Sequence, residues 1–243
     1  MYMRKHVRRK KILILSPHLD DAVLDCCDHI LSWKKAGHSI SIVTVFTKFT
    51  NRYISQTARK YMQRSGFNNT KDFEAARKVE DVRAMKLLDV EWKHLNYVDG
   101  WYRIFKNAPI YNGEELFTGK ISEVEFDLLE EIRNSLRVYH EYDHVCIPLG
   151  IGRHTDHVIV RNVAESMFNH RKIDFYADFP YAYQYKNWSF SALYKLLFLK
   201  RSFKKFSPWK RIVLDCYASQ IPILFPWYPV NNKMYPEILL MSC

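Results

Sequence analysis

"KILILSPHLDDAVLDCC", residues 11–27, is the stretch that decides the fold. Its first five residues form a short apolar run that is typical of a buried strand. A histidine and two adjacent aspartates, His18, Asp20 and Asp21, follow where this strand ends. Neighbouring carboxylates repel each other and lose hydration when they are buried, so their placement requires a compensating group. A bound cation is the first candidate.

Outward from this stretch, apolar runs alternate with helical patterns. Because strands that are separated by helices form parallel sheets, we expect an α/β fold with a mostly parallel sheet and helices on both faces. Strands are predicted at 11–15, 39–46, 92–98, 144–150 and 172–179, and helices at 21–36, 71–88, 122–139 and 156–168. Residues 47–70 are expected to form a polar excursion, Ser122 and Glu125 a capping box, and the proline-containing end, 221–240, an irregular cover.

Length and composition indicate one globular domain over residues 1–243, with a basic tail at 1–10 and a C-terminal cap at about 184–243 packed on the core. The chain is 48% hydrophobic, which excludes a disordered protein. No apolar run approaches the roughly 18 residues of a membrane span, and no signal-like stretch follows the basic start, so we expect a cytoplasmic protein. Five cysteines without a CxxC spacing support neither a disulfide framework nor a thiolate zinc site.

The net charge of +11 is concentrated in two segments. Residues 1–11 carry six Lys or Arg and residues 179–214 carry eight, and neither segment contains an acid. Such segments are often solvated, but they can also bind an anionic substrate, a lipid headgroup or nucleic acid. No recognition motif accompanies the charge, so we expect no specific nucleic-acid partner. The mixture of basic and apolar residues at 191–206 leaves open a weak contact with a membrane surface.

A second chemically distinctive stretch, "PLGIGRHTDHVIV" at residues 148–160, follows another predicted strand. Parallel sheets bind ligands at the carboxyl ends of their strands, so this stretch and the first one are expected to meet. Imidazole and carboxylate ligands suit Zn²⁺ or Fe²⁺. The candidate ligands are His18, Asp21 and one or both of His154 and His157. Asp20 is left free to act as a general base on water.

These two motifs resemble those of the PIG-L/LmbE-like family of zinc-dependent N-acetylglucosaminyl deacetylases. The resemblance extends through "RKVEDVRAMKLL" (77–88), "NYVDGWYR" (96–103), "YADFPYAY" (176–183) and "CYASQ" (216–220), and so covers nearly the whole chain. It implies a Rossmann-like three-layer sandwich. It also implies a hydrolase that uses metal-activated water to remove an acetyl group from an N-acetylated amino sugar.

The resemblance also assigns roles to individual residues. It implies that His18, Asp21 and His157 bind the metal and that Asp20 is the general base. His154, oriented by Asp156, would stabilise the oxyanion or protonate the leaving amine. Arg77 and Asp99 match positions that hold sugar hydroxyls.

One departure from the family pattern concerns a tyrosine. Some members carry a tyrosine two residues before the first histidine of the second motif, where this chain has Gly152. If a tyrosine assists the oxyanion here, Tyr181 or Tyr183 would have to supply it.

The expected substrate is an N-acetylglucosamine-type conjugate, with a nucleotide, phosphate or lipid as possible aglycone. Two alternatives stay open. The same ligands could serve a metal-dependent phosphoesterase, or the chain could be a non-catalytic sugar-binding protein that retains the metal site. The sequence leaves open which sugar is bound, which metal is native and how many copies of the chain associate.

Overall fold

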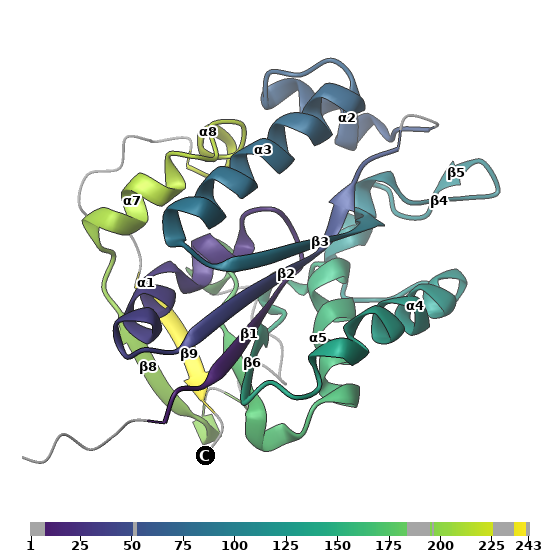
Figure 1. Ribbon diagram of the computed structural model, residues 1–243. Helices are drawn as coiled ribbons and strands as arrows, with labels where there is room; N and C mark the ends of the chain where they lie inside the picture. Colours follow the sequence, from purple (N-terminus) through teal and green to yellow (C-terminus); the bar gives the residue numbers. More distant parts are fainter. Residues whose placement is uncertain (1–7, 51–52, 184–194, 196, 226–235, 242–243) are drawn as a thin grey trace, which may run out of the picture.

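The computed structural model describes residues 8–50, 53–183, 195, 197–225 and 236–241. Its centre is a seven-stranded sheet with the strand order β3-β2-β1-β6-β7-β9-β8 (Figure 1). The strands are β1 (Lys11–Ser16), β2 (Ser39–Lys48), β3 (Glu91–Val98), β6 (His144–Pro148), β7 (Ile173–Tyr176), β8 (Lys200–Lys204) and β9 (Glu237–Met241). The first five of these run parallel to one another, whereas β9 pairs antiparallel with both β7 and β8.

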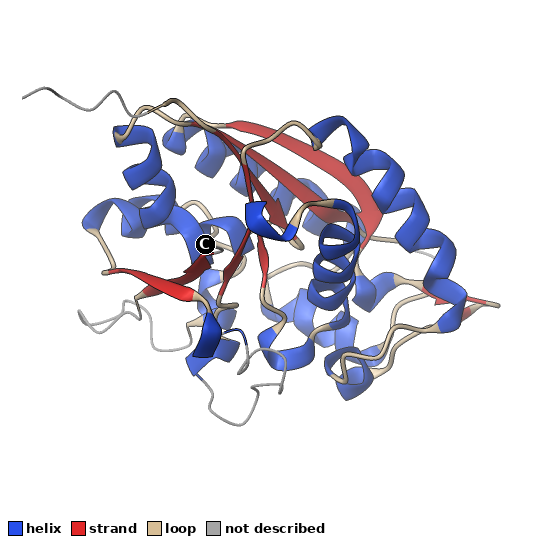
Figure 2. Cartoon of the chain, turned by 90° about the horizontal axis from the view of Figure 1, so that it is seen from below, coloured by secondary structure: helices blue, strands red, loops and turns tan. Residues whose placement is uncertain are grey.

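Helices cover both faces of this sheet (Figure 2). On one face, α1 (Asp21–Lys35) packs against α3 (Thr70–Leu88) and α7 (Pro208–Leu214); on the other, α4 (Phe126–Leu136) packs against α5 (Thr155–Met167). Two shorter helices, α2 (Gln56–Arg64) and α8 (Ile221–Leu224), complete the helical layers. Each face buries its own apolar core, one containing Ile14 and Ile30, the other Leu15 and Ile159. The predicted three-layer α/β sandwich is therefore confirmed.

The position of β1 explains where a ligand can bind. Residues 12–16 are buried, because this strand has neighbouring strands on both sides and helices on both faces. β1 pairs in parallel with β2 on one side and with β6 on the other, so the chain order reverses between β1 and β6. The loops that leave β1 and β6 diverge at this switch point and leave a crevice at the carboxyl ends of the strands.

The structure corrects three expectations. The segment 47–70 contains α2, and the C-terminal end, expected to be irregular, supplies β9 to the sheet. Ser122 makes no side-chain cap: the Glu125 side chain, 2% exposed, contacts Arg103 and Tyr111 instead. In each case tertiary contacts override the local pattern. Most of the predicted tail (1–7) and parts of the predicted cap (184–194 and 226–235) lie outside the described residues.

Among the described residues, no helix combines the length and the apolar character that a membrane span requires.

Candidate active site

The loop that leaves β1 is fixed by its own hydrogen bonds. Ser16 Oγ donates to the carbonyl of His18 (2.7 Å) and accepts from the N–H of Ala22 (3.1 Å), which joins the loop to the first turn of α1. The N–H of His18 donates to Asp21 Oδ2 (2.8 Å), and Nδ1 of the same histidine lies 3.3 Å from that oxygen. Asp21 thus orients both the backbone and the ring of His18.

The loop that leaves β6 depends on two glycines. Gly150 (φ 78°) and Gly152 (φ 81°) adopt left-handed conformations, which glycine reaches without steric cost. The resulting turn places His154 at the N-cap of α5, where its Nδ1 accepts from the N–H of Asp156 (3.2 Å). A Cβ at Gly152 would lie 2.3 Å from the ring of Tyr181, so only glycine lets that ring pack there.

His157, in the first turn of α5, completes the group. Its Nε2 lies 3.5 Å from Asp21 Oδ2, and its Nδ1 donates to Asp178 Oδ1 (2.6 Å). The other oxygen of Asp178 accepts from the N–H of Ile151 (2.8 Å), which fixes the carboxylate. Asp178 is fully buried and lies two residues beyond the end of β7. It was not among the site residues predicted from the sequence.

The structure brings His18, Asp21 and His157 together, and their donor atoms fit a divalent metal. Asp21 Oδ2 faces the Nδ1 of His18 and the Nε2 of His157. The remaining nitrogen of each ring faces a buried carboxylate, Asp156 for His18 and Asp178 for His157. Histidine ligands of metals commonly donate their second N–H in this way. His154 is also near: it, His18 and His157 each offer a nitrogen within 4.8 Å of the others.

A second possible donor group exists in the same region. His18, Asp99 and Asp156 also offer atoms within 4.8 Å of one another. Asp156 Oδ2, however, is already engaged by the N–H of Gly100 (2.9 Å) and by His18 Nε2 (3.0 Å). The side of Nδ1 of His18, which faces Asp21, is therefore the one where a metal could be held.

Asp20 stands beside this group with a different partner. One of its oxygens lies 3.1 Å from Nη2 of Arg77, and the aspartate is 8% exposed. Burial raises the pKa of Asp20 to about 6, although the charge of Arg77 opposes the shift. For Asp21, burial acts in the same direction, but the nearby charge of His157 and the contacts of His18 hold its pKa below the ordinary value. The two adjacent carboxylates are thus differentiated by their surroundings.

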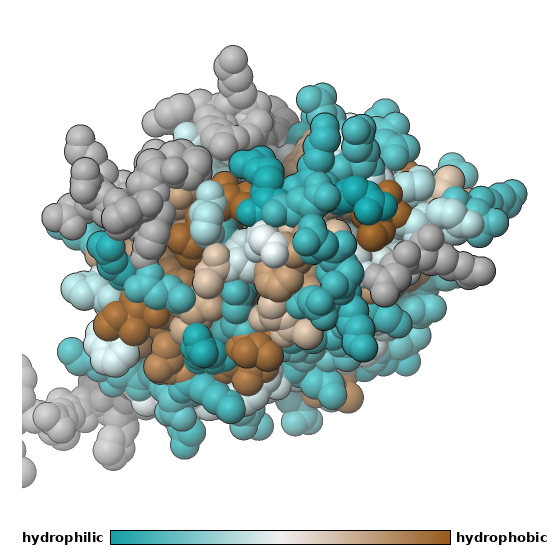
Figure 3. All heavy atoms as spheres, turned by 90° about the horizontal axis from the view of Figure 1, so that it is seen from above, coloured by the Kyte–Doolittle hydropathy of each residue, from teal (hydrophilic) through white to brown (hydrophobic). Residues whose placement is uncertain are grey.

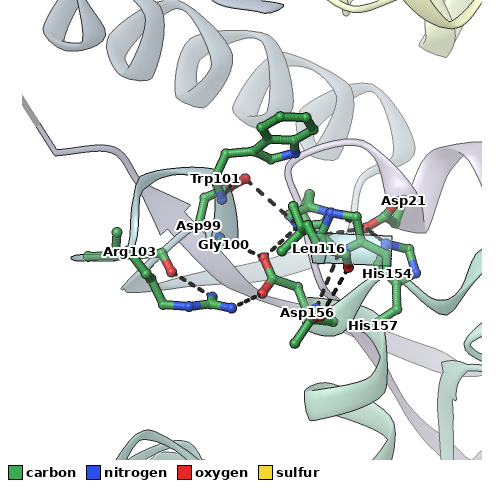
Figure 4. A network of polar contacts seen from close by, with 12 residues as sticks. Asp21, Asp99, Gly100, Trp101, Arg103, Leu116, His154, Asp156 and His157 are labelled. Atoms are coloured by element: carbon green, nitrogen blue, oxygen red, sulfur yellow. Dashed lines mark hydrogen bonds and ion pairs between the residues drawn. The ribbon is translucent and has the colours of Figure 1, made fainter. Parts of the chain in front are cut away.

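The resemblance implied that Asp156 orients His154, but the carboxylate of Asp156 makes no hydrogen bond to His154. The contact between them runs through the backbone N–H of Asp156, while its side chain lies between Gly100 and Arg103 (Figure 4). Its oxygens contact His18 Nε2 (3.0 Å) and Arg103 Nη2 (2.5 Å).

Arg77 and Asp99 both line the cleft, and their binding of sugar hydroxyls stays a prediction. The carboxylate of Asp99 accepts from the N–H of Trp101 (2.9 Å) and lies 3.8 Å from Nε2 of His18. Arg77 belongs to α3 and lies on the buried face of that helix. Val79, one of the apolar residues that recur every three positions along the same helix, is instead 63% exposed.

Aromatic side chains form the walls of the cleft, which encloses about 120 Å³. Trp101 stacks on Tyr61 (ring centroids 6.2 Å apart), and Phe117 meets the ring of His154 edge-on (5.1 Å). Tyr181 lines the cleft, whereas the hydroxyl of Tyr183 donates to the carbonyl of Pro236. Of the two tyrosines left open by the sequence, only Tyr181 belongs to this site.

The chain is similar to several known deacetylases. A 2'-N-acetylparomamine deacetylase of Niallia circulans is 24% identical over 233 residues, which cover 89% of this chain and 83% of that protein. A protein of the same name from Streptomyces fradiae is 25% identical over 185 residues, 75% of this chain and 61% of the relative's length. The crystal structure of a deacetylase from teicoplanin biosynthesis superposes with a TM-score of 0.74 at 22% identity, covering 95% of this chain and 96% of that one.

The family model for PIG-L, described as GlcNAc-PI de-N-acetylase, matches residues 13–168. The matched range contains both loops described above, from the end of β1 to α5. Since it spans more than half of the 243 residues, this chain belongs to the PIG-L family of de-N-acetylases.

Proposed function

We propose that this protein is a metal-dependent hydrolase that removes the acetyl group from an N-acetylated amino sugar of the N-acetylglucosamine type. One observation carries the proposal. The carboxylate of Asp20 lies in the same cleft as the donor group of His18, Asp21 and His157, is held by Arg77 at 3.1 Å, and has a pKa raised by burial. Such a carboxylate is suited to accept a proton from water near neutral pH.

The residues that would hold the metal are His18, Asp21 and His157. Two imidazoles and one carboxylate suit Zn²⁺, and Fe²⁺ is the alternative that the same ligands accept. When bound, the ion polarises the acetyl carbonyl and lowers the pKa of water.

The remaining steps belong to side chains of this chain. Asp20 accepts the proton of the attacking water and gives it to the leaving amine as the C–N bond breaks, and Arg77 holds its carboxylate in place. Nδ1 of His154 accepts a hydrogen bond from the Asp156 N–H, and burial together with the charge of His18 lowers the pKa of His154 well below its ordinary value. A neutral His154 therefore carries its proton on Nε2, from which it can donate to the oxyanion of the tetrahedral intermediate.

We assign Tyr181 as a second hydrogen-bond donor to the oxyanion. Its ring packs against Gly152 and meets the ring of His157 edge-on, with centroids 6.2 Å apart. Its pKa is raised well above the ordinary value by burial and by the nearby carboxylates, first among them Asp21, so the hydroxyl keeps its proton. A protonated hydroxyl can donate to a developing negative charge.

Among the described residues that line the cleft, no unpaired Lys or Arg is available to bind a phosphate group of a substrate. Asp20, Asp21 and Asp99 line the cleft, and Arg77, the cation among its described lining residues, is paired with Asp20. Lys186 lies outside the described residues, and none of the other seven basic residues of 179–214 lines the described cleft wall; Lys210, for example, is 3% exposed and binds Glu237. The names of the curated relatives, which describe an N-acetylated aminoglycoside, point in the same direction.

The experiment is a substrate panel with the zinc-loaded full chain. The panel contains N-acetylglucosamine, its phosphates, a nucleotide conjugate, a lipid-linked form and an N-acetylated aminoglycoside, and the readouts are free amine, acetate and inorganic phosphate. We expect amine and acetate in equal amounts from at least one N-acetylated sugar, and a rate lower by about 10²- to 10⁴-fold with Asp20→Asn. Release of phosphate without acetate would instead indicate a phosphoesterase, and binding without turnover would indicate a non-catalytic sugar-binding protein.

A further inference from the structure

Asp156 is one of two fully enclosed carboxylates next to the candidate metal ligands, the other being Asp178. The side chain of Asp156 is fully buried, and its two oxygens have different partners. Oδ2 accepts from the N–H of Gly100 (2.9 Å) and contacts Nε2 of His18 (3.0 Å). Oδ1 forms an ion pair with Nη2 of Arg103 (2.5 Å). Gly100 therefore holds this carboxylate from the side of Oδ2, and the charge of Arg103 holds it from the side of Oδ1.

Arg103 is itself held on every arm of its guanidinium group. Its Nε pairs with Glu125, its Nη1 donates to the carbonyl of Val98 (3.0 Å), and its Nη2 faces Asp156. The guanidinium carbon lies 5.0 Å from the centroid of the Phe46 ring and 5.7 Å from that of Tyr111. A planar fork with three separate partners is a geometry that lysine cannot reproduce.

The chain of contacts extends outward through a residue that the sequence analysis placed in a helix cap. Glu125, 2% exposed, accepts from the hydroxyl of Tyr111 as well as from Arg103. The Tyr111 oxygen in turn accepts from the N–H of Ser122 (3.0 Å). A series of buried contacts thus connects the 3₁₀ turn Glu123–Glu125, which precedes α4, to the ring of His18.

Gly100 shows how tightly this arrangement is packed. A Cβ at this position would lie 2.6 Å from Leu116, 3.0 Å from Asp156 Oδ1 and 3.1 Å from Nη2 of Arg103. The segment that follows β3 can approach the ion pair, and donate its N–H to Asp156, only because residue 100 lacks a side chain (Figure 4).

We infer that Arg103 is a positioning residue for the metal site. It fixes Asp156 so that Oδ2 receives the Nε2–H of His18 and the Nδ1 of His18 stays directed toward Asp21. The His157 side is held differently: Asp178 is fixed by the backbone N–H of Ile151. Loss of Arg103 should therefore loosen one of the two histidines. This inference rests on the proposed function only in taking His18 as a metal ligand.

The test measures Zn²⁺ affinity by competition with a chelator of known affinity, on the full chain. We expect Arg103→Met to weaken Zn²⁺ binding about 10-fold, the lower end of what loss of an outer-shell partner costs. Arg103→Lys should recover little of this loss, and Glu125→Gln should give a smaller loss of the same sign. Arg133→Met is the matched control, because Arg133 forms its ion pair with Glu130 on the surface. It removes the same charge and should leave the affinity unchanged.

The thermal midpoint of each metal-free variant separates positioning from folding. A merely structural role would lower the midpoint and leave the Zn²⁺ affinity of the folded protein intact, and this result would overturn the inference. If Arg103→Met does not fold, Glu125→Gln decides, since it keeps the size of the side chain; wild-type affinity in that variant would count against the inference. Because metal affinity needs no substrate, failure of the substrate panel would overturn the proposed function and leave this result standing.

Discussion

At the scale of single residues, the site uses two adjacent carboxylates for different purposes. Asp21 contacts two histidines and is held in the charged form, whereas Asp20 faces Arg77 and has a raised pKa. The chemistry of each follows from its neighbours, because both have the same intrinsic acidity.

Asp20→Asn keeps the size of the side chain and removes its capacity to accept a proton. We expect kcat for deacetylation to fall about 10²- to 10⁴-fold, the usual range for loss of a general base. Zn²⁺ affinity, measured by the same chelator competition, should stay near the wild-type value. Unchanged turnover, or loss of the metal together with activity, would assign Asp20 a different role.

The two tyrosines of the segment 181–183 provide a matched pair. Tyr181→Phe should lower kcat about 10-fold with little change in KM, since an oxyanion donor acts in the transition state and shares its task here with His154. Tyr183→Phe should leave both constants unchanged, because this hydroxyl donates to the Pro236 carbonyl outside the cleft. Equal effects of the two substitutions would remove Tyr181 from the mechanism.

At the scale of elements, β9 stabilises α1, the helix that follows the loop carrying His18 and Asp20. Glu237, at the start of β9, accepts from the N–H groups of Asp28 and His29 in α1, and it pairs with Lys210 of α7 at 2.8 Å. The Nζ of Lys210 also donates to the carbonyl of Leu24 in α1. β9 and α7 therefore contact the middle of α1 through one buried ion pair.

Glu237→Gln should lower the free energy of unfolding by about 3 kcal/mol near pH 7, because it leaves Lys210 without its charged partner in the interior. Burial acts to raise the pKa of Glu237, but Lys210 and His29 hold it below its ordinary value of 4.5. A carboxyl with a depressed pKa stabilises the fold above its unfolded pKa and loses that contribution as the pH falls.

Denaturant titrations of wild type and variant at several pH values test this prediction. The difference in unfolding free energy should be constant above about pH 4.5 and shrink below it. Glu114→Gln, at an exposed position, is the control and should show no difference. A difference that grows as the pH falls would contradict the assigned direction.

At the scale of the whole molecule, the sequence predicts the framework better than the site. The strands 11–15 and 144–150 and the helices 21–36 and 71–88 are present within one or two residues, although α3 buries Arg77 and exposes Val79, against its apolar spacing. β8 and β9 were not predicted, since they are short and follow segments without clear alternation. Asp178 and Arg103 were missed because they act through contacts between distant segments, which spacing along the chain does not record.

Apolar and charged side chains are mixed on one face of the molecule (Figure 3). On the face that carries α3 and α7, hydrophobic patches are separated by hydrophilic side chains (Figure 3). Exposed apolar residues there include Val79, Trp209 and Ile212, and exposed cations include Arg83 and Lys86. Contact between the segment 191–206 and a membrane surface stays a prediction, and residues 191–194 and 196 lie outside the described residues.

Metal removal should destabilise the whole molecule, because the ion would join loops from opposite sides of the switch point. With free Zn²⁺ at 100 times its dissociation constant, binding to the folded state alone should stabilise the protein by about 2.7 kcal/mol. Differential scanning fluorimetry with Zn²⁺ and with a chelator measures the shift. The double variant His18→Ala, His157→Ala should show no shift; a shift that persists in it would place the ion elsewhere.

The central claim is that His18, Asp21 and His157 together bind one divalent ion. Anomalous diffraction at the zinc edge from crystals of the zinc-loaded wild-type protein tests it most directly. The account predicts a single strong peak bounded by Nδ1 of His18, the Asp21 carboxylate and Nε2 of His157. A peak between His18, Asp99 and Asp156, or no peak in this cleft at saturating Zn²⁺, would contradict it.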